Sequence, residues 1–114
     1  LAGYTQLLTE KNIAFSAIAQ EEIGQMQDIS LRAVSALLSG EGGSVEWLSQ
    51  VAQLEQRIDD MTAVFRRNQL RRMREGACSA EACILYSELL TDFERIGDHV
   101  LNIAEELTKV RTSL

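Results

Sequence analysis

The chain has 114 residues, a length that suits one domain, and 46% of them are hydrophobic, which is enough for a continuous core. It contains no proline and only 5% aromatic residues, which favours long uninterrupted helices over a β-sandwich or barrel with many turns. The net charge of −6 repels nucleic acid and anionic lipid, and no apolar run approaches the roughly 20 residues of a transmembrane helix. We therefore expect one helical domain without a nucleic-acid partner and without direct insertion into a membrane.

Residues 1–12 are the least regular part of the chain. Leu1, Tyr4, Leu7 and Leu8 could form a short amphipathic helix that ends near Asn12. Because the first residue is leucine rather than methionine, we expect the chain to be a piece of a longer protein.

The first long helix is expected from residue 13 to residue 39. Apolar residues recur here in steps of three and four, the spacing of one helix face, and Gly40 follows as a C-terminal stop. Glycines at positions 40, 42 and 43 then predict a flexible turn. The expected buried face consists of Ala19, Ile23, Met26, Ile29, Ala33 and Leu37.

The second helix is expected from residue 45 to residue 74, with Ser44 as its N-cap and Gly76 just after its end. Its expected buried stripe consists of Trp47, Val51, Leu54, Ile58, Met61 and Phe65. Cations near its C-terminus complement the negative end of the helix dipole. A solvated face explains most of them, and docking to an acidic partner or a membrane surface is the alternative. These cations are Arg66, Arg67, Arg71, Arg72 and Arg74.

The third helix is expected from residue 80 to residue 112, with Ser79 as its N-cap. Two adjoining apolar stripes on one helix imply contact with two neighbouring helices. Since short loops join the long helices, we predict an all-α fold, an antiparallel up-down-up three-helix bundle. One stripe consists of Phe93, Ile96, Val100, Ile103, Leu107, Val110 and Leu114, and the other of Tyr86, Leu90, Gly97, Leu101 and Ala104.

Cys78 and Cys83 lie at the predicted turn before the third helix and at the start of that helix. A structural zinc site needs about four ligands, and the chain has no matching pair of cysteines or histidines. We interpret both as free thiols, which suits a reducing compartment. The single His99 is interpreted as a surface or core histidine rather than a metal ligand.

Two pairs of carboxylates are spaced one helical turn apart: Glu55 with Asp59, and Glu94 with Asp98. Carboxylates on adjacent turns of one face repel each other, so pairing them gains nothing unless a cation lies between them. If the two pairs converge, we expect their repulsion to raise the pKa of at least one group. The alternative is a solvated acidic face, because such spacings also arise by chance in an acidic chain.

Residues 94–105 read Glu-Arg-Ile-Gly-Asp-His-Val-Leu-Asn-Ile-Ala-Glu. This stretch resembles the third-helix signature of PhoU-like domains, which are helical modules associated with phosphate-uptake regulation. It looks like the version fused to the cytoplasmic end of sodium-phosphate cotransporter family proteins in particular. PhoU proteins usually carry two three-helix repeats, whereas residues 1–114 have the length of one. The resemblance implies a non-catalytic regulatory domain on the cytoplasmic side of the membrane, as part of a larger membrane protein.

The resemblance also implies a metal site, because PhoU-like domains bind metal through paired Glu/Asp-x-x-x-Asp motifs. The candidate ligands are Glu55, Asp59, Glu94 and Asp98, and Asn102 and Glu105 could extend the set. Carboxylates suit hard cations such as Mg²⁺, Ca²⁺, Mn²⁺ or ferric iron, and the family adds zinc and nickel. A further pair, Glu88 and Asp92, faces elsewhere and lies outside the signature.

The implied partner is the membrane domain of a phosphate transporter, in the same chain or an associated one. A single repeat also implies a homo-oligomer, in which a leftover apolar stripe of the third helix or the N-terminal segment replaces the second repeat. The alternative is a helical oligomerisation or interaction module without metal. A ferritin-type oxidase is disfavoured because it needs Glu-x-x-His, a spacing that Glu94 and His99 do not have.

Overall fold

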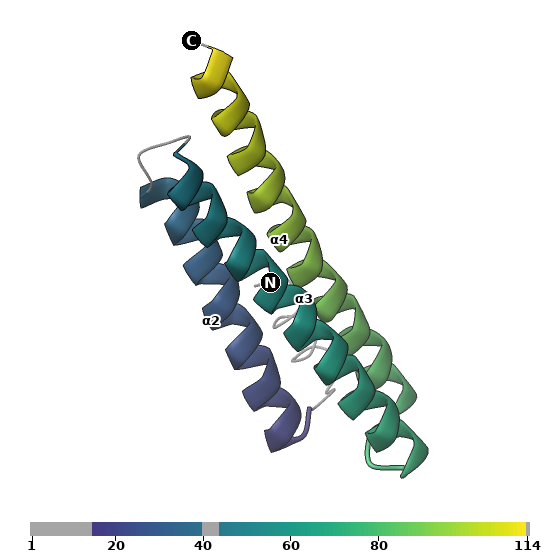
Figure 1. The fold of residues 1–114 in the computed structure, drawn as a ribbon. Helices are drawn as coiled ribbons and strands as arrows, with labels where there is room; N and C mark the ends of the chain where they lie inside the picture. The colour runs from purple at the N-terminus through teal and green to yellow at the C-terminus, as the bar shows by residue number, and fades with distance from the viewer. Residues whose placement is uncertain (1–14, 40–43, 114) are drawn as a thin grey trace.

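The computed structural model describes residues 15–39 and 44–113, and these form three α-helices without a strand. The helices are α2 (Ala17–Ser39), α3 (Val45–Arg74) and α4 (Ala80–Ser113), and they lie side by side (Figure 1). The prediction of an all-α fold with three long helices is therefore confirmed. The predicted N-terminal segment, the glycine turn at 40–43 and Leu114 lie outside the described residues.

Serine hydroxyls define the start of each helix. Ser44 Oγ accepts from the backbone N–H of Trp47 at 3.1 Å, and Ser79 Oγ accepts from that of Ala82 at 3.1 Å, as predicted. Ser16 Oγ caps α2 in the same way, by accepting from the backbone N–H of Ala19, and the helix begins at Ala17. The predicted helix included residues 15 and 16, which lie before this start, so the prediction was wrong for these two residues. After α3, Gly76 has a φ of +71°, a left-handed conformation that only glycine adopts readily.

Neighbouring helices run in opposite directions, as the pairs of contacting residues show. Arg66 bonds to Ser87, whereas Glu55, earlier on α3, approaches Asp98, later on α4. Between α2 and α3, the indole Nε1 of Trp47 donates to the carbonyl of Ala36 at 2.8 Å, which joins the start of α3 to the end of α2. This arrangement places the middle of α3 beside the middle of α4 (Figure 1).

The core follows the apolar periodicity along most of the helices. On α2 and α3, every residue of the two expected stripes is buried or partly buried in the common core. On α4, the second stripe is buried at Tyr86, Leu90, Gly97 and Ala104 and partly buried at Leu101. Two neighbours thus cover the predicted faces.

The first stripe of α4 is buried only over its N-terminal half. Phe93 and Val100 are buried, but Ile103, Leu107 and Val110 are 48%, 43% and 58% exposed, so their predicted burial was wrong. A stripe that repeats every seven residues drifts around a straight helix by about 20° per heptad. In addition, α4 extends past the ends of its neighbours, which leaves its last turns uncovered (Figure 1). None of the three described helices is both long and apolar enough to span a bilayer.

Gly97 of α4 packs tightly against α3. A Cβ atom at this position would lie 3.2 Å from Ile58 Cδ1, tighter than ordinary van der Waals contact. We therefore expect Gly97→Leu to lower the free energy of unfolding by about 1–3 kcal/mol through overpacking, although leucine has the better helix propensity by about 1 kcal/mol. Thermal or urea unfolding measures this change.

Gly24 in α2 provides the matched control, because a Cβ there would meet nothing within 4 Å. Gly24→Leu should raise the melting temperature. A rise for Gly97→Leu as well would show that Gly97 does not pack against Ile58.

Candidate functional site

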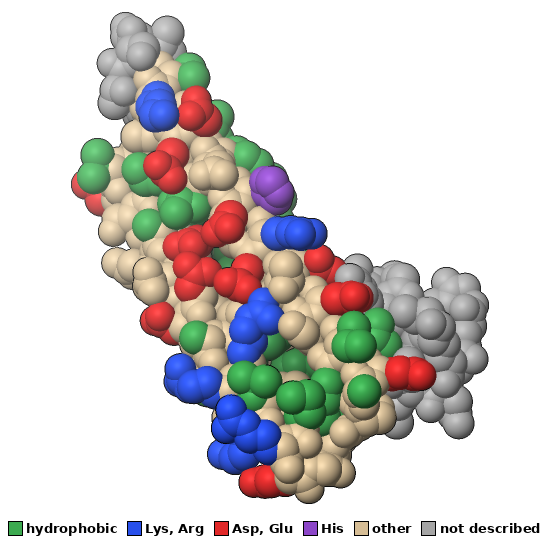
Figure 2. Space-filling view, turned by 90° about the vertical axis from the view of Figure 1, so that its right-hand side faces the viewer, with side chains coloured by type: hydrophobic (Ala, Val, Ile, Leu, Met, Phe, Trp, Pro, Cys, Tyr) green, Lys and Arg blue, Asp and Glu red, His purple; other side chains and the backbone are tan. Residues whose placement is uncertain are grey.

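Three of the predicted ligands meet on the face shared by α3 and α4. Carboxylate oxygens of Glu55, Asp59 and Asp98 all lie within 4.8 Å of one another. Glu55 and Asp59 stand on successive turns of α3 and are partly buried, whereas Asp98 reaches them from α4 and is exposed. Figure 2 shows acidic side chains gathered on this face. Three converging carboxylates are a ligand set that hard cations accept.

Glu94 is not part of this group. Its Oε1 accepts from Arg66 Nη2 at 2.7 Å, and Arg66 also donates to Ser87 Oγ at 3.0 Å and to Thr91 Oγ1 at 2.8 Å. The structure therefore brings together three of the four predicted ligands and places the fourth in an ion pair. Arg66 reaches from α3 to α4 and holds Glu94 in this ion pair.

The remaining candidates lie further along α4. Asn102 and Glu105 are exposed, and Glu105 does not belong to the group of three carboxylates. His99 is also exposed, which places it on the helix surface.

Gly97 connects the packing of the bundle to this site. A Cβ at Gly97 would lie 3.6 Å from Glu55 Cγ, so the missing side chain lets α4 approach α3 beside the acidic pair. Asp98 is the next residue in the chain, so the close approach of α4 at Gly97 also brings Asp98 near Glu55. The glycine therefore helps to crowd the three carboxylates.

This crowding changes the protonation of Glu55. Burial, followed by the charges and hydrogen bonding of Asp59 and Asp98, raises the pKa of Glu55 to about 7. This agrees with the expectation that converging carboxylates raise at least one pKa. A proton or a bound cation would relieve the repulsion, and a metal that displaces the proton would bind in a pH-dependent manner.

A second polar cluster, centred on Glu22 of α2, was missed by the sequence interpretation. The Glu22 carboxylate is buried and accepts from Arg72 Nη2 at 2.6 Å, Tyr86 Oη at 2.6 Å and Asn68 Nδ2 at 2.8 Å. Its partners come from α3 and α4, so one carboxylate joins all three helices. The signal was present, because Glu22 lies three residues after Ala19 and four before Met26, within the apolar face of α2.

The protonation states of this cluster follow from its contacts. Burial alone would raise the pKa of Glu22, but hydrogen bonds from Arg72, Tyr86 and Asn68 outweigh it and hold the pKa below its ordinary value. Burial, reinforced by the hydrogen bond to the Glu22 carboxylate, raises the pKa of the Tyr86 hydroxyl. The cluster therefore pairs an ionised Glu22 with a protonated Tyr86.

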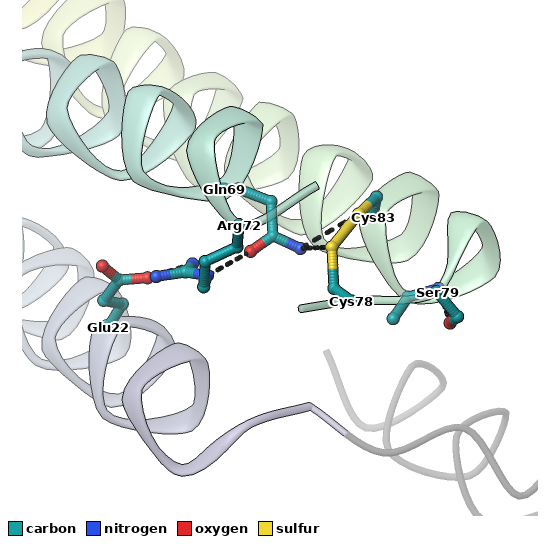
Figure 3. The surroundings of a disulfide bond; sticks show 7 residues. Glu22, Gln69, Arg72, Cys78, Ser79 and Cys83 are labelled. Atoms are coloured by element: carbon teal, nitrogen blue, oxygen red, sulfur yellow. Dashed lines mark hydrogen bonds and ion pairs between the residues drawn. A yellow bond between two sulfur atoms is a disulfide. The ribbon is translucent and has the colours of Figure 1, made fainter. Parts of the chain in front are cut away.

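The interpretation of the two cysteines as free thiols was wrong. Cys78 and Cys83 form a disulfide between the α3–α4 turn and the first turn of α4 (Figure 3). Gln69 Nε2 donates to both sulfur atoms at 3.7 and 3.6 Å, and Gln69 Oε1 accepts from Arg72 Nε at 2.8 Å. The lack of further zinc ligands argued against a structural zinc site, but it did not exclude a disulfide. At the start of α4, the Cα atoms of Cys78 and Cys83 lie 6.5 Å apart, within the range that a disulfide spans.

Comparison with known proteins identifies related sequences. A family model described as "PhoU domain" matches residues 21–107. The "Phosphate-specific transport system accessory protein PhoU homolog 1" of Thermotoga maritima is 31% identical over 106 residues, which is 92% of this chain. The chain covers 45% of that relative, so it spans less than half of the relative's length. No solved structure matches.

Proposed function

Because the chain belongs to the PhoU domain family, we propose that it is a non-catalytic regulatory domain of phosphate transport. The observation that carries this proposal is the family match over residues 21–107, which contains both polar clusters of the bundle. The relative from Thermotoga maritima is named as an accessory protein of a phosphate-specific transport system. By this proposal, one up-down-up repeat acts on the cytoplasmic side of a phosphate transporter's membrane domain, in the same chain or an associated one.

The proposal includes a metal ion at the face shared by α3 and α4. Glu55, Asp59 and Asp98 would supply carboxylate oxygens, a donor set that fits Mg²⁺, Mn²⁺ or ferric iron better than a metal that prefers sulfur. The family resemblance also includes zinc. The raised pKa of Glu55 supports the fit, since three negative groups share too little space to be ionised at no cost. Glu94 would join only after releasing Arg66.

A bound cation would supply positive charge between two helices that otherwise repel each other at this level. Its effect on the bundle would be to hold α3 and α4 together beside Gly97. Partner binding could then depend on the metal through the shape and charge of this face.

The alternative function is an oligomerisation or interaction module that binds no metal. One observation favours it: Leu70, Met73 and Ile84 are exposed large hydrophobic residues on neighbouring helices. Metal analysis of the purified protein separates the two functions.

The regulatory role can be tested by phosphate uptake in host cells that lack the protein containing this chain. We expect the initial rate of radiolabelled phosphate uptake to change severalfold on deletion and to return when the wild-type protein is restored. Asp59→Asn combined with Asp98→Asn should fail to restore it, whereas Asp28→Asn combined with Asp60→Asn, with the same change of charge outside the cluster, should succeed. Equal uptake with and without the protein, at both low and high external phosphate, would contradict the proposed function.

A further inference from the structure

An apolar groove lies between α3 and α4, at the end of the bundle near the turn that joins them. Its volume is about 450 Å³, and its floor and walls include Leu70 and Met73 of α3 and Ala80 and Ile84 of α4. Leu70, Met73 and Ile84 are 47%, 46% and 59% exposed, so three large apolar side chains of one surface face solvent. A contiguous apolar surface of this kind is typical of a protein interface.

The two flanks of this groove carry opposite charges. On α3, three exposed arginines lie beside Leu70 and Met73, on the side of the helix that faces away from α4. They are Arg67, Arg71 and Arg74. On α4, the exposed Glu81 and Glu88 lie one turn before and one turn after Ile84, on the side of the helix that faces away from α3. Figure 2 shows hydrophobic side chains with basic ones on one side and acidic ones on the other. The groove therefore has a basic edge and an acidic edge.

A second copy of the chain can match this pattern in only one of two face-to-face orientations. A two-fold axis across the groove would place α3 on α3 and bring the basic edges together. A two-fold axis along the groove places α3 of each copy over α4 of the other, so each basic edge meets an acidic edge. The heights also agree, because Arg66 lies level with Ser87 and hence Arg67 and Arg71 lie level with the stretch between Glu81 and Glu88.

From this charge pattern we infer that the groove is a homodimer interface with its two-fold axis along α3 and α4. The apolar floors of the two grooves then cover each other, and arginines of one copy face glutamates of the other at both edges. This inference goes beyond the proposed function, since it assigns a surface and an orientation to self-association. By this inference, the two copies meet at the groove rather than at the exposed C-terminal part of the first α4 stripe.

Sedimentation velocity over a range of protein concentrations tests the interface, with charge-reversed variants of each edge. The basic-edge variant combines Arg67→Glu with Arg71→Glu, and the acidic-edge variant combines Glu81→Lys with Glu88→Lys. Each variant places like charges at both edges, so we expect its dimer dissociation constant to rise by at least about tenfold. A control that combines Arg32→Glu with Arg57→Glu has the charge of the basic-edge variant but lies away from the groove, and it should dimerise like the wild type.

Mixing the two edge variants gives the decisive measurement. In a mixed dimer, the new glutamates of one chain face the new lysines of the other, and the unchanged edges remain complementary. We therefore expect the equimolar mixture to recover a dimer that neither variant forms at the same concentration. A wild-type monomer at all concentrations, edge variants that dimerise normally, or a mixture that stays monomeric would each overturn the inference. None of these results would alter the phosphate-uptake test.

Discussion

Arg72→Leu is expected to lower the free energy of unfolding by about 3–5 kcal/mol, the usual cost of removing one partner of a buried ion pair. The Arg72 and Glu22 side chains are only 10% and 7% exposed, and their atoms meet at 2.6 Å. Without Arg72, the carboxylate stays buried with only the neutral donors Tyr86 and Asn68, which do not compensate its charge. Urea unfolding measures the loss.

Arg57→Leu is the matched control, because Arg57 lies on the same helix, is exposed and lies away from the groove. Its effect should stay within about 0.5 kcal/mol. Combining Glu22→Met with Arg72→Met should recover much of the stability lost in Arg72→Leu, since an apolar pair leaves no buried charge. Equal losses for Arg57→Leu and Arg72→Leu would show that the ion pair does not stabilise the bundle.

The same network has an expected pH dependence. Because the pKa of Glu22 is lower in the folded than in the unfolded chain, its contribution is fully present above the unfolded value of about 4.3. The contribution is lost as the pH falls further, through the folded pKa. Glu22→Gln should therefore flatten the decrease in stability below about pH 4.

Local signals explain why the helices were predictable. Ser44 and Gly76 mark the two ends of α3 within the helix's own sequence, and the predicted range of 45–74 is confirmed. Gly97 lies within an apolar stripe of the sequence, where a glycine indicates that a neighbouring helix comes close, and Ile58 of α3 is that neighbour. In these cases the information lies within a few residues of the feature.

The errors concern contacts between residues far apart in the sequence. The spacing of Glu94 and Asp98 places both on one face, but it does not reveal that Arg66, 28 residues earlier, takes Glu94. Glu22 was overlooked because only apolar residues were assigned to the stripe of α2. Its charged partner, Arg72, is 50 residues away in the sequence, so the local sequence does not show the ion pair. A charged residue in register with an apolar stripe is the pattern that would have identified this cluster.

A metal ion that binds Glu55, Asp59 and Asp98 in the folded state is expected to stabilise the bundle by RT ln(1 + [L]/Kd). This amounts to about 2.7 kcal/mol at a hundredfold excess over Kd. Without metal, the raised pKa of Glu55 means that the folded chain binds more protons than the unfolded chain between about pH 4.3 and 7. Stability should therefore fall as the pH rises through this range. The gain from metal should increase over the same range, because the metal competes with the proton on Glu55.

Thermal unfolding with Mg²⁺, Mn²⁺ or Fe³⁺, and with a chelator, tests this site, and two variants separate the observed group from the predicted set of four. Asp98→Asn keeps the size of the side chain but removes one charge and one strong oxygen ligand. Its metal-dependent gain should shrink sharply, and its metal-free form should be slightly more stable than the wild type because the repulsion on Glu55 is smaller. Glu94→Gln should keep the gain, because Glu94 is bound to Arg66 rather than to the group of three. A wild type that responds to neither metal nor chelator would leave these carboxylates as a solvated acidic face, and loss of the gain in Glu94→Gln would mean that Glu94 leaves Arg66 to bind the metal.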